Sequence, residues 1–585
     1  MSTSSVAPGG VSQTRSFTTV FLIEMWERFG YYGMQVLIVY YMVQRLGFAD
    51  ERATLTWGAA AALIYVSPAF GGWVGDKILG TRRTMLTGAI ILAIGYALMA
   101  VPGVSTWFLF CALGVIVVGN GLFKANAGNL VRKIYEGDDS KIDSAFTIYY
   151  MAVNVGAMVS QLLTPVIKDY VNQAYGNELG WHAAFAVCSI GLLVGLANYM
   201  MMRNTMRAIG SEPDHHPVSL PKLGAVLGLG LVAVFISAWI LQYEMVARVF
   251  VYVAGAAVLG IFVYLISNSA RSERAGMVAA LVLTIQTVFF FIFYQQMSTS
   301  LSLFALRNVD PAFNIFGLHL WDWKPAQFQA LNPIWIFILS PLLAVLYTRA
   351  GRSGKDLSIA AKFAVGFAAV AAGFFIYSAA GHFTTAPGKT TAWIMVWGYG
   401  LSSLGELLVS GLGLAMIARY VPARMGGFMM GAYFVASGVS QYLGGVVSTF
   451  ASIPDTIGKI LAGSSVPLVG KVQAAYPAVM SMNLKDFGKW VDGADQSGEI
   501  ASHAHLPTFS SLPQQGQDLL HQFNQLLFTS TMPTYTTLFF WLGVAGIVCT
   551  VIALAVLPLM RKLSDQHNAH ALAEETGLPT IGSEE

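Results

Sequence analysis

Three charged residues lie within one strongly apolar stretch near the start of the chain. Glu24, Glu27 and Arg28 fall inside the run 20–41, which is long enough to cross a bilayer as a helix. A charge at mid-bilayer costs on the order of 2.5–3.5 kcal/mol, so such residues face a bundle interior or a wet cavity. At helical spacing they share one face with Tyr31, Tyr32 and Gln35. This polar stripe predicts the wall of a water-accessible path.

Lys124 and Glu406 are the other charged side chains expected well inside the membrane. None of the ten histidines falls in the middle of an apolar run, so protons, if they move, must be carried by carboxylates. Three interior carboxylates face two interior cations, which leaves one unbalanced negative charge if all of them ionise. We therefore expect one carboxylate to take a proton from outside, most readily at Glu24 or Glu27.

The composition sets the class of protein. The chain has 585 residues, of which 55% are hydrophobic and 11% charged, whereas soluble domains carry about 25% charged residues. This predicts an all-α, polytopic membrane protein. The net charge of +3 is too small to indicate nucleic-acid binding. The three cysteines lie in apolar runs without disulfide or zinc spacing, and no nucleophile–base pair or phosphate loop is visible. We expect no enzyme activity, no catalytic residue, no metal and no cofactor.

Fourteen apolar runs predict fourteen transmembrane helices. Lys and Arg gather in alternate connecting segments, which places both termini in the cytoplasm. The expected spans are 20–46, 54–75, 84–101, 106–130, 143–167, 181–202, 222–241, 248–267, 276–300, 327–347, 358–380, 391–418, 425–450 and 535–560.

The expected domain organisation follows from these spans. It comprises a cytoplasmic N-terminal tail (1–17), an N-terminal six-helix bundle (18–205), a linker with two extra transmembrane helices (206–275), a C-terminal six-helix bundle (276–560) and a cytoplasmic C-terminal tail (561–585). The second bundle contains a long outer loop, 451–534, expected to cover the outer rim with a short amphipathic helix at the interface around Leu519 to Leu527. The C-terminal tail is expected to be short and mostly disordered.

The segment from Gly71 to Arg83 resembles the loop signature of the major facilitator superfamily, a fold of two six-helix bundles around a central cavity. Arg82 and Arg83 are then expected to anchor to lipid headgroups.

The first-helix element resembles the ExxERFxYY motif of the proton-dependent oligopeptide transporters of that superfamily, in the segment Glu24-x-x-Glu27-Arg28-Phe29-x-Tyr31-Tyr32. Further segments resemble that family's fourth, fifth and tenth helices and the eighth-helix asparagine: Gly119 to Asn126, Phe146 to Gly156, Leu404 to Ser410, and Asn332-Pro333. The two extra helices resemble those of bacterial members. The resemblance covers about residues 18–450 and the last helix.

This resemblance implies a proton-coupled symporter in the bacterial inner membrane that imports di- and tripeptides by alternating access. Proton coupling is expected of Glu24, Glu27, Arg28, Lys124 and Glu406. A peptide is a zwitterion with ends roughly 5–8 Å apart. Arg28 and Lys124 would hold its carboxylate, and Glu406, Asn154 and Asn332 its ammonium. The remaining expected binding residues are Tyr31, Tyr32, Gln35, Tyr65, Tyr150, Phe293, Tyr294, Ser410 and Tyr433. We expect a monomer whose partners are peptides, protons and the bilayer.

Other interpretations stay open from the residues alone. Glu24 and Arg28 could be an ion pair that only holds helices together, although burying such a pair is costly. Lys124 could be a structural partner of a first-helix glutamate, Asn154 and Asn332 could satisfy helix backbones, and packing alone is a strong alternative for the aromatic residues. At the level of function, a carrier of another cargo and a peptide receptor that does not transport remain alternatives.

Two departures from the family pattern bear on coupling. Many members have an arginine seven residues after the motif arginine, facing the tenth-helix glutamate, where this chain has Gln35. Many also carry a histidine on the second helix, whereas the matching stretch 59–68 has none. Both departures leave coupling to Glu24, Glu27 and Glu406.

Overall fold

The computed structural model describes residues 11–103, 105–136, 139–176, 179–315, 317–352, 357–421, 423–493, 495 and 498–576. Most of these residues are helical, and the described strands form two small antiparallel hairpins. The predicted all-α fold is therefore confirmed. The strands are β1 (Ala312–Ile315) with β2 (Leu318–Asp322), and β3 (Thr384–Ala386) with β4 (Lys389–Thr390).

Each of the fourteen predicted apolar runs coincides with a helix. By length and composition, eleven spans of the described residues could cross a membrane. The long helices are α1 (Gln13–Tyr40), α2 (Asp50–Val66) continued by α3 (Pro68–Val74), α4 (Thr81–Met99), α5 (Thr106–Ile134), α6 (Asp139–Tyr175), α7 (Leu179–Met202), α8 (Leu220–Gln242), α9 (Glu244–Asn268), α10 (Arg271–Gln295), α12 (Leu331–Arg352), α13 (Ile359–Ser378), α14 (Trp393–Tyr420), α15 (Ala423–Ser448) and α20 (Gln514–Thr576). The ninth of the predicted spans is broken after α10 and resumes as α11 (Ser300–Asn308).

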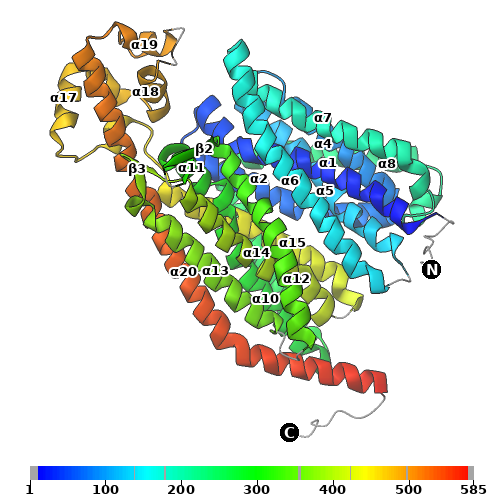
Figure 1. Ribbon diagram of the computed structural model, residues 1–585. Helices are drawn as coiled ribbons and strands as arrows, with labels where there is room; N and C mark the ends of the chain where they lie inside the picture. Colours follow the sequence, from blue (N-terminus) through cyan, green and yellow to red (C-terminus); the bar gives the residue numbers. More distant parts are fainter. Residues whose placement is uncertain are drawn as a thin grey trace.

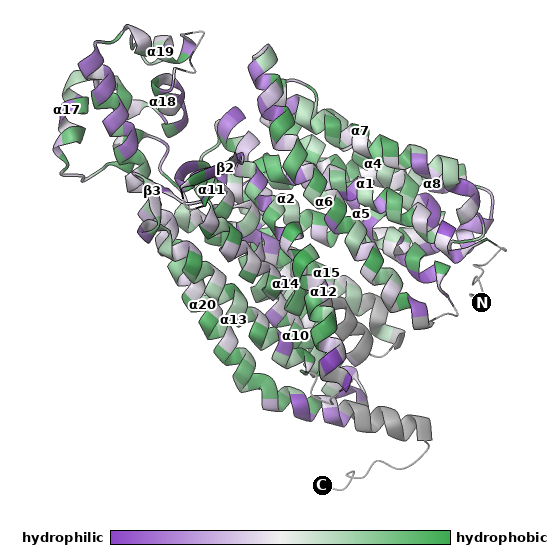
Figure 2. Ribbon diagram, in the orientation of Figure 1, coloured by the Kyte–Doolittle hydropathy of each residue, from purple (hydrophilic) through white to green (hydrophobic). Residues whose placement is uncertain are grey.

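The helices form two bodies, α1 to α7 and α10 to α15 with α20 (Figure 1). The extra helices α8 and α9 join them, because α8 packs on α5 and α9 packs on α15. Apolar residues cover most of the length of both bodies, as Figure 2 shows in green. In a membrane, small residues allow such helices to approach closely. At the α2–α15 contact, for example, a Cβ on Gly58 would lie 3.2 Å from Cα of Gly445.

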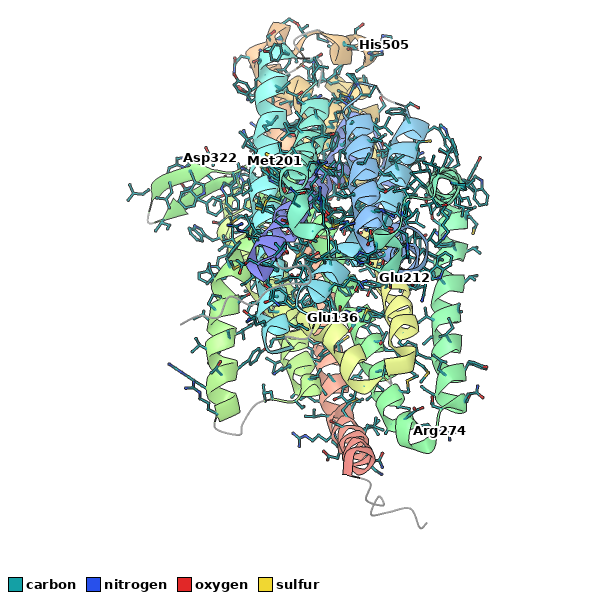
Figure 3. All side chains as sticks on the ribbon, turned by 90° about the vertical axis from the view of Figure 1, so that its right-hand side faces the viewer. Glu136, Met201, Glu212, Arg274, Asp322 and His505 are labelled. Carbon is teal, nitrogen blue, oxygen red and sulfur yellow. The ribbon has the colours of Figure 1, made fainter. Side chains whose placement is uncertain are left out.

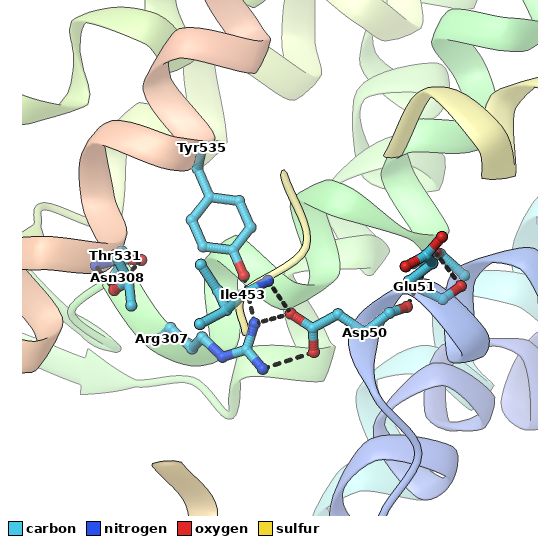
Figure 4. A network of polar contacts seen from close by, with 8 residues as sticks. Asp50, Glu51, Arg307, Asn308, Ile453, Thr531 and Tyr535 are labelled. Carbon is cyan, nitrogen blue, oxygen red and sulfur yellow. Dashed lines mark hydrogen bonds and ion pairs between the residues drawn. The ribbon is translucent and has the colours of Figure 1, made fainter. Parts of the chain in front are cut away.

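At the end of the molecule that is remote from both chain termini, hydrogen bonds join the two bodies (Figure 1). We call the remote end the outer end. There, Tyr40 of α1 donates a 2.8 Å hydrogen bond to the carbonyl of Ser302 of α11, and Trp57 of α2 donates one of 3.0 Å to Ser298 Oγ. Asp50 of α2 also forms a bidentate pair with Arg307 of α11 (Figure 4). These contacts close the outer end.

The outer loop is a small helical subdomain rather than a loop with one interfacial helix. It contains α16 (Ile457–Ile460), α17 (Pro467–Ala475), α18 (Leu484–Val491) and α19 (Glu499–His503), packed on the first part of α20. Leu520, Phe523 and Leu527 point into its apolar core. The expectation of an amphipathic helix lying on the membrane around these residues was wrong, because the other short helices cover that apolar face.

The last helix is longer than its predicted span. α20 runs without interruption from the outer subdomain past the C-terminal body to Thr576, and Figure 1 shows it bending near its far end. Pro558 lies inside it, and proline removes a backbone hydrogen bond and bends a helix. The expected disordered tail is therefore helical up to Thr576, and residues 577–585 lie outside the described part of the chain.

Arg82 and Arg83 donate hydrogen bonds to protein groups rather than to lipid headgroups. Their backbone N–H groups donate to the carboxylate of Asp214, at 3.0 and 3.2 Å, so Asp214 caps the start of α4 from the linker. Their side chains donate to backbone carbonyls of the same linker, including that of Pro213. Contacts with the linker replace the expected contact with lipid headgroups, because the guanidinium N–H groups already donate to these carbonyls. Gly80, with φ of 99°, gives the chain the turn that this arrangement requires.

Candidate functional site

Glu24, Glu27 and Arg28 form a buried ionic cluster in the middle of α1. Arg28 Nε lies 2.5 Å from Glu27 Oε2 and 3.3 Å from Glu24 Oε1. All three residues are at most 4% exposed. One oxygen of each carboxylate, Glu24 Oε2 and Glu27 Oε1, is buried without a hydrogen-bond partner among the described residues. The cluster therefore has one shared cation and two free acceptor atoms.

A close helix contact positions this cluster. Gly156 of α6 lies directly on α1, where a Cβ would be 2.9 Å from the backbone nitrogen of Phe29 and 3.2 Å from Cβ of Arg28. Tyr149, two turns earlier on α6, lies against Glu24. The fifth-helix motif thus fixes α1 from the side, so the glycine has a packing role that its place in the motif did not reveal.

Asn120 is a site residue that sequence reasoning missed. Its Oδ1 accepts a 3.4 Å hydrogen bond from Arg28 Nη2, and its Nδ2 donates one of 3.0 Å to the carbonyl of Ile64 on α2. Asn120 is fully buried and joins α1, α2 and α5. It stands inside the Gly119 to Asn126 motif, so the signal was present, but an asparagine in a helix does not by itself predict a charged partner.

Lys124 lies one turn further along α5. Its Nζ is 4.7 Å from the centroid of the Tyr65 ring, a cation–π contact, and it lies within electrostatic range of Glu24, Glu27 and Arg28. The structure thus places both interior cations in one region, with an aromatic face beside the second.

Glu406 lies in the other body, on α14. Its Oε2 accepts a 2.6 Å hydrogen bond from Asn332 Nδ2 of α12, which also contacts Ser403 Oγ at 3.0 Å. Tyr150 of α6 lies against the same carboxylate, so a residue of the N-terminal body reaches it. Ser403 was not predicted, because a serine one turn from a glutamate has no distinctive spacing.

Tyrosines connect the two charged regions. Tyr32 lies within electrostatic range of both Arg28 and Glu406, and it also lies against Tyr294 of α10. Tyr65 has the same two charged neighbours. Tyr31 places its ring 5.3 Å from Cζ of Arg28 and packs edge-on against Tyr32. The site is a chamber with a cationic and acidic wall on one body and a carboxylate on the other.

Tyr150 marks the border of the chamber. This residue is 39% exposed, although it lies against Glu406, which is 7% exposed.

Some predicted site residues are not brought to these groups. Phe293 is buried against Phe367 and Phe374 of α13, and Tyr433 is buried beside Phe434 on α15. Asn154, by contrast, does reach the site: its side chain donates to the carbonyl of Tyr150 and also contacts the Tyr150 hydroxyl, which lies against Glu406. Gln35 and Ser410 are half-buried, one turn from Tyr31 and Glu406 respectively. In the described part of the chain, no group of His, Cys, Asp and Glu could hold a metal ion.

Residues 82–463, well over half of the chain, match the family model described as the POT family. The chain belongs to the POT family. It is 43% identical over 446 residues to dipeptide and tripeptide permease B of Aliivibrio fischeri (strain MJ11), covering 76% of this chain and 88% of that relative. The corresponding permease of Salmonella typhimurium (strain LT2) is 41% identical over 452 residues, with 77% and 90% covered.

Solved structures agree with this assignment. The tetrameric PepTSo2 structure is 60% identical, covers 94% of this chain and 100% of its own, and superposes with a TM-score of 0.74. A peptide transporter POT in complex with sulfate, at 24% identity and a TM-score of 0.68, shares the fold. The predicted family is therefore confirmed. This POT-family chain is a multi-pass membrane protein that transports peptides and is not an enzyme.

Proposed function

We propose that this POT-family chain is a proton-coupled symporter that imports di- and tripeptides by alternating access. The observation that carries the proposal is the placement of the Glu24–Glu27–Arg28 cluster and Glu406 on opposite bodies, with Tyr32 between them. A short zwitterion needs a cationic and an anionic group a few ångströms apart, and this chamber offers both. Relatives at 41–43% identity are called dipeptide and tripeptide permeases.

The peptide carboxylate is held by Arg28 and Lys124, which are the two cations of the chamber. Its ammonium is held by Glu406, with Asn332 orienting that carboxylate through the 2.6 Å hydrogen bond. Asn154 contributes through its oxygen, because its amide group already donates to the carbonyl of Tyr150. These charges recognise the two ends of the peptide main chain. The peptide side chains are held only by loosely packed walls of the chamber, so peptides of many sequences fit.

The proton is carried by the first-helix glutamates. The unpartnered oxygens of Glu24 and Glu27 are free to accept it. Protonation of one of them reduces its hold on Arg28, which then turns to the peptide carboxylate. Glu406 pairs with the peptide ammonium and can carry a further proton. A membrane potential, negative inside, assists the inward step by about 2.3 kcal/mol per charge and 100 mV.

The conformation described above is the inward-facing state of the cycle. The two bodies are joined at the outer end by the contacts of Tyr40, Trp57 and Asp50. Alternating access requires these outer contacts to open while the opposite ends approach. This assignment places both termini in the cytoplasm and the protein in the bacterial inner membrane, with domain limits as predicted above.

One chain contains the whole chamber, so we propose that the monomer is the transport unit. The related PepTSo2 is described as tetrameric, and a tetramer of complete units is compatible with this proposal. Native mass spectrometry of the purified protein gives the oligomeric state of this chain. Transport by protein that has been dispersed to monomers tests whether the monomer is the transport unit.

Transport in reconstituted vesicles tests the function. Uptake of di-, tri- and tetrapeptides is measured with a pH gradient, with and without a proton ionophore. We expect accumulation of di- and tripeptides that the ionophore abolishes. Glu24→Gln and Glu27→Gln should lose gradient-driven accumulation, while peptide counterflow survives at least one of them. Full accumulation by both variants would overturn the coupling assignment. A carrier of another cargo would show no competition by dipeptides, and a receptor would bind them without accumulation.

A further inference from the structure

Two buried polar atoms inside the N-terminal body have no hydrogen-bond partner in the part of the chain that the structure describes. One is Oε1 of Glu27 on α1, and the other is the hydroxyl oxygen of Tyr96 on α4. Both residues are 0% exposed. Glu27 is also the charged group with the largest effect on the Tyr96 hydroxyl, followed by Arg28. A buried polar atom without a hydrogen bond is costly, so two such atoms in one region call for an explanation.

A glycine on α1 admits the Tyr96 ring to this region. Gly30 follows Glu27 by three residues, so the two lie on the same face of α1. A Cβ on Gly30 would lie 2.7 Å from Cε2 of Tyr96, the ring carbon next to the one that bears the hydroxyl. The same Cβ would lie 3.2 Å from the carbonyl oxygen of Cys188 on α7. The Tyr96 hydroxyl is therefore held close to the face of α1 that carries Glu27.

The two carboxylates of α1 have different tyrosine neighbours. Glu24 is the charged group with the largest effect on Tyr149 of α6, whereas Glu27 has that place for Tyr96. Glu27 uses its other oxygen, Oε2, for the 2.5 Å pair with Arg28 Nε. Oε1 is thus the atom of this carboxylate that can accept a proton without displacing the guanidinium.

Charges of both signs surround the Glu27 carboxylate. Arg28 and Lys124 favour its ionised form, whereas Glu24 opposes it. These effects partly cancel, so one hydrogen bond can change the balance between the ionised and the protonated carboxylate. The titratable groups that face Glu27 or Tyr96 are Glu24, Arg28, Tyr31 and Tyr32 of α1, Lys124 of α5, Tyr149 of α6 and Cys188 of α7.

We propose that Glu27 Oε1 is the atom that receives the coupled proton and that Tyr96 is its positioning residue. When Glu27 is ionised, the Tyr96 hydroxyl donates to Oε1, after a small rotation of the carboxylate or through one water. When a proton adds to Oε1, the new O–H donates to the tyrosine oxygen, so the hydrogen bond reverses its direction. Arg28 then loses a negative partner and is freed for the peptide carboxylate. This inference rests on the proton coupling proposed above and names the carboxylate that carries it.

The pH dependence of dipeptide binding to the full-length protein in detergent tests this role. Affinity is measured against pH for the unmodified protein, Tyr96→Phe and Tyr199→Phe. Phenylalanine keeps the ring and removes only the hydroxyl. Because that hydroxyl stabilises the ionised carboxylate more than the protonated one, Tyr96→Phe should move the pH midpoint of binding upward by roughly one unit.

Tyr199→Phe is the matched control. Tyr199 of α7 is 2% exposed, and its hydroxyl also has no hydrogen-bond partner among the described residues. Its charged neighbours are Arg82 and Asp214 rather than the α1 cluster. Two residues further on, Met201 lies at the surface of the N-terminal body that Figure 3 turns to the viewer. This variant should keep the pH midpoint of the unmodified protein.

The same substitution in two backgrounds identifies its partner. Tyr96→Phe should keep its shift in Glu24→Gln and show none in Glu27→Gln. Equal shifts in both backgrounds, or an unshifted midpoint for Tyr96→Phe alone, would overturn the proposal. So would loss of the pH dependence in Glu24→Gln but not in Glu27→Gln. Binding by the unmodified protein that does not change with pH, with uptake that an ionophore does not affect, would instead contradict proton coupling itself, and this inference with it.

A second readout needs only the single variants, so it also serves if a double variant does not fold. Infrared difference spectra between acidic and neutral pH contain the C=O stretch of the protonated carboxyl group, and hydrogen bonding lowers its frequency. We expect this band to move to higher frequency in Tyr96→Phe and to stay in place in Tyr199→Phe. A band that is the same in both variants would overturn the assignment of Tyr96.

Discussion

At the scale of single residues, the chemistry of the chamber depends on how Arg28 is held. Glu27 and Glu24 attract it from its own helix, and Asn120 accepts from it across the bundle. The contact with Asn120 is independent of the protonation of the glutamates, as is the contact of Arg28 with the Tyr31 ring. Asn120 therefore supplies the hydrogen bond that, together with the Tyr31 ring, keeps the guanidinium in the chamber when a proton weakens the ion pairs.

We predict that Asn120→Ala weakens peptide binding while leaving proton coupling in place. A hydrogen bond to a charged group contributes about 1.5–3 kcal/mol, so the apparent KM for a dipeptide should rise roughly tenfold or more. Asn129→Ala is the control, because this asparagine of α5 contacts Asp76 at the exposed end of the helix. KM and kcat of uptake are measured for both variants. An unchanged KM for Asn120→Ala would show that Asn120 does not position Arg28 for peptide binding.

A second residue-scale prediction concerns Lys389, outside the membrane. Its Nζ lies 4.4 Å from the centroid of the Phe528 ring, and burial lowers the pKa of Lys389 to about 8, although Asp310 and Asp492 nearby oppose the shift. The unfolded chain, with lysine near its ordinary pKa of about 10.4, then binds more protons above pH 8. The stability of this contact should therefore rise between about pH 8 and 10.4 and be lost as the pH falls through 8.

The measurement is protease resistance of the outer subdomain across this pH range. Lys389→Met should remove the increase, because it keeps the apolar contact with Phe528 and cannot bind a proton. Lys459→Met, at an exposed lysine of the same subdomain, should keep the increase. The assignment fails if both variants show the same pH profile.

At the scale of secondary-structure elements, glycines decide how near the helices approach. Gly156 brings α6 onto α1 at the ionic cluster, whereas Gly128 of α5 has open space around it, with nothing within 4 Å of an added Cβ. Two glycines in neighbouring helices thus have opposite roles, and only the packing distinguishes them.

We predict that Gly156→Ala lowers the melting temperature by several degrees and weakens peptide uptake. The added methyl group must push α1 away, and overpacking costs about 1–3 kcal/mol. Gly128→Ala should be neutral or stabilising, because alanine is favoured over glycine in a helix by about 1 kcal/mol. Melting temperature and uptake are compared for the two variants. A Gly156→Ala protein as stable as Gly128→Ala would contradict this account of the α1–α6 contact.

At the scale of the whole molecule, one carboxylate joins four parts of the chain (Figure 4). Asp50 of α2 accepts from both Nη atoms of Arg307, at 2.5 and 2.7 Å, and from the backbone nitrogen of Ile453 at 3.0 Å. Arg307 also donates to the hydroxyl of Tyr535 on α20, at 2.6 Å. Asp50 alone belongs to the N-terminal body, so opening the outer end must break all its bonds.

We predict that Asp50→Asn shifts the protein toward a state with an open outer end. Removal of one partner of a buried pair costs about 3–5 kcal/mol, which is comparable to a conformational equilibrium. The readout is labelling of Leu37→Cys by a membrane-impermeant maleimide, in a background without the three native cysteines, since Leu37 is 1% exposed here. Labelling should accelerate with Asp50→Asn and not with Glu244→Gln, which breaks an exposed pair within α9. If Leu37→Cys is labelled at the same rate with and without Asp50→Asn, the Asp50–Arg307 pair does not control closure of the outer end.

The sequence by itself determined the membrane helices, the charges inside them and the family. An ionisable residue in an apolar run is expensive, so Glu24, Glu27, Arg28, Lys124 and Glu406 could be found from their positions alone. The aromatic residues could not be sorted in this way. Phe293 and Tyr294 are neighbours in one apolar run, and only the rotation of α10 decides that Tyr294 lies near Tyr32 and Glu406 while Phe293 packs on α13.

Tertiary structure alone decided the remaining features. The outer subdomain is built from short helices whose packing partners lie tens of residues away in the sequence, so no local period indicated it. The same holds for Asn120, Ser403 and the Asp50–Arg307 pair. Their roles come from contacts between distant helices, and such contacts depend on close packing of whole elements rather than on the spacing of residues within one.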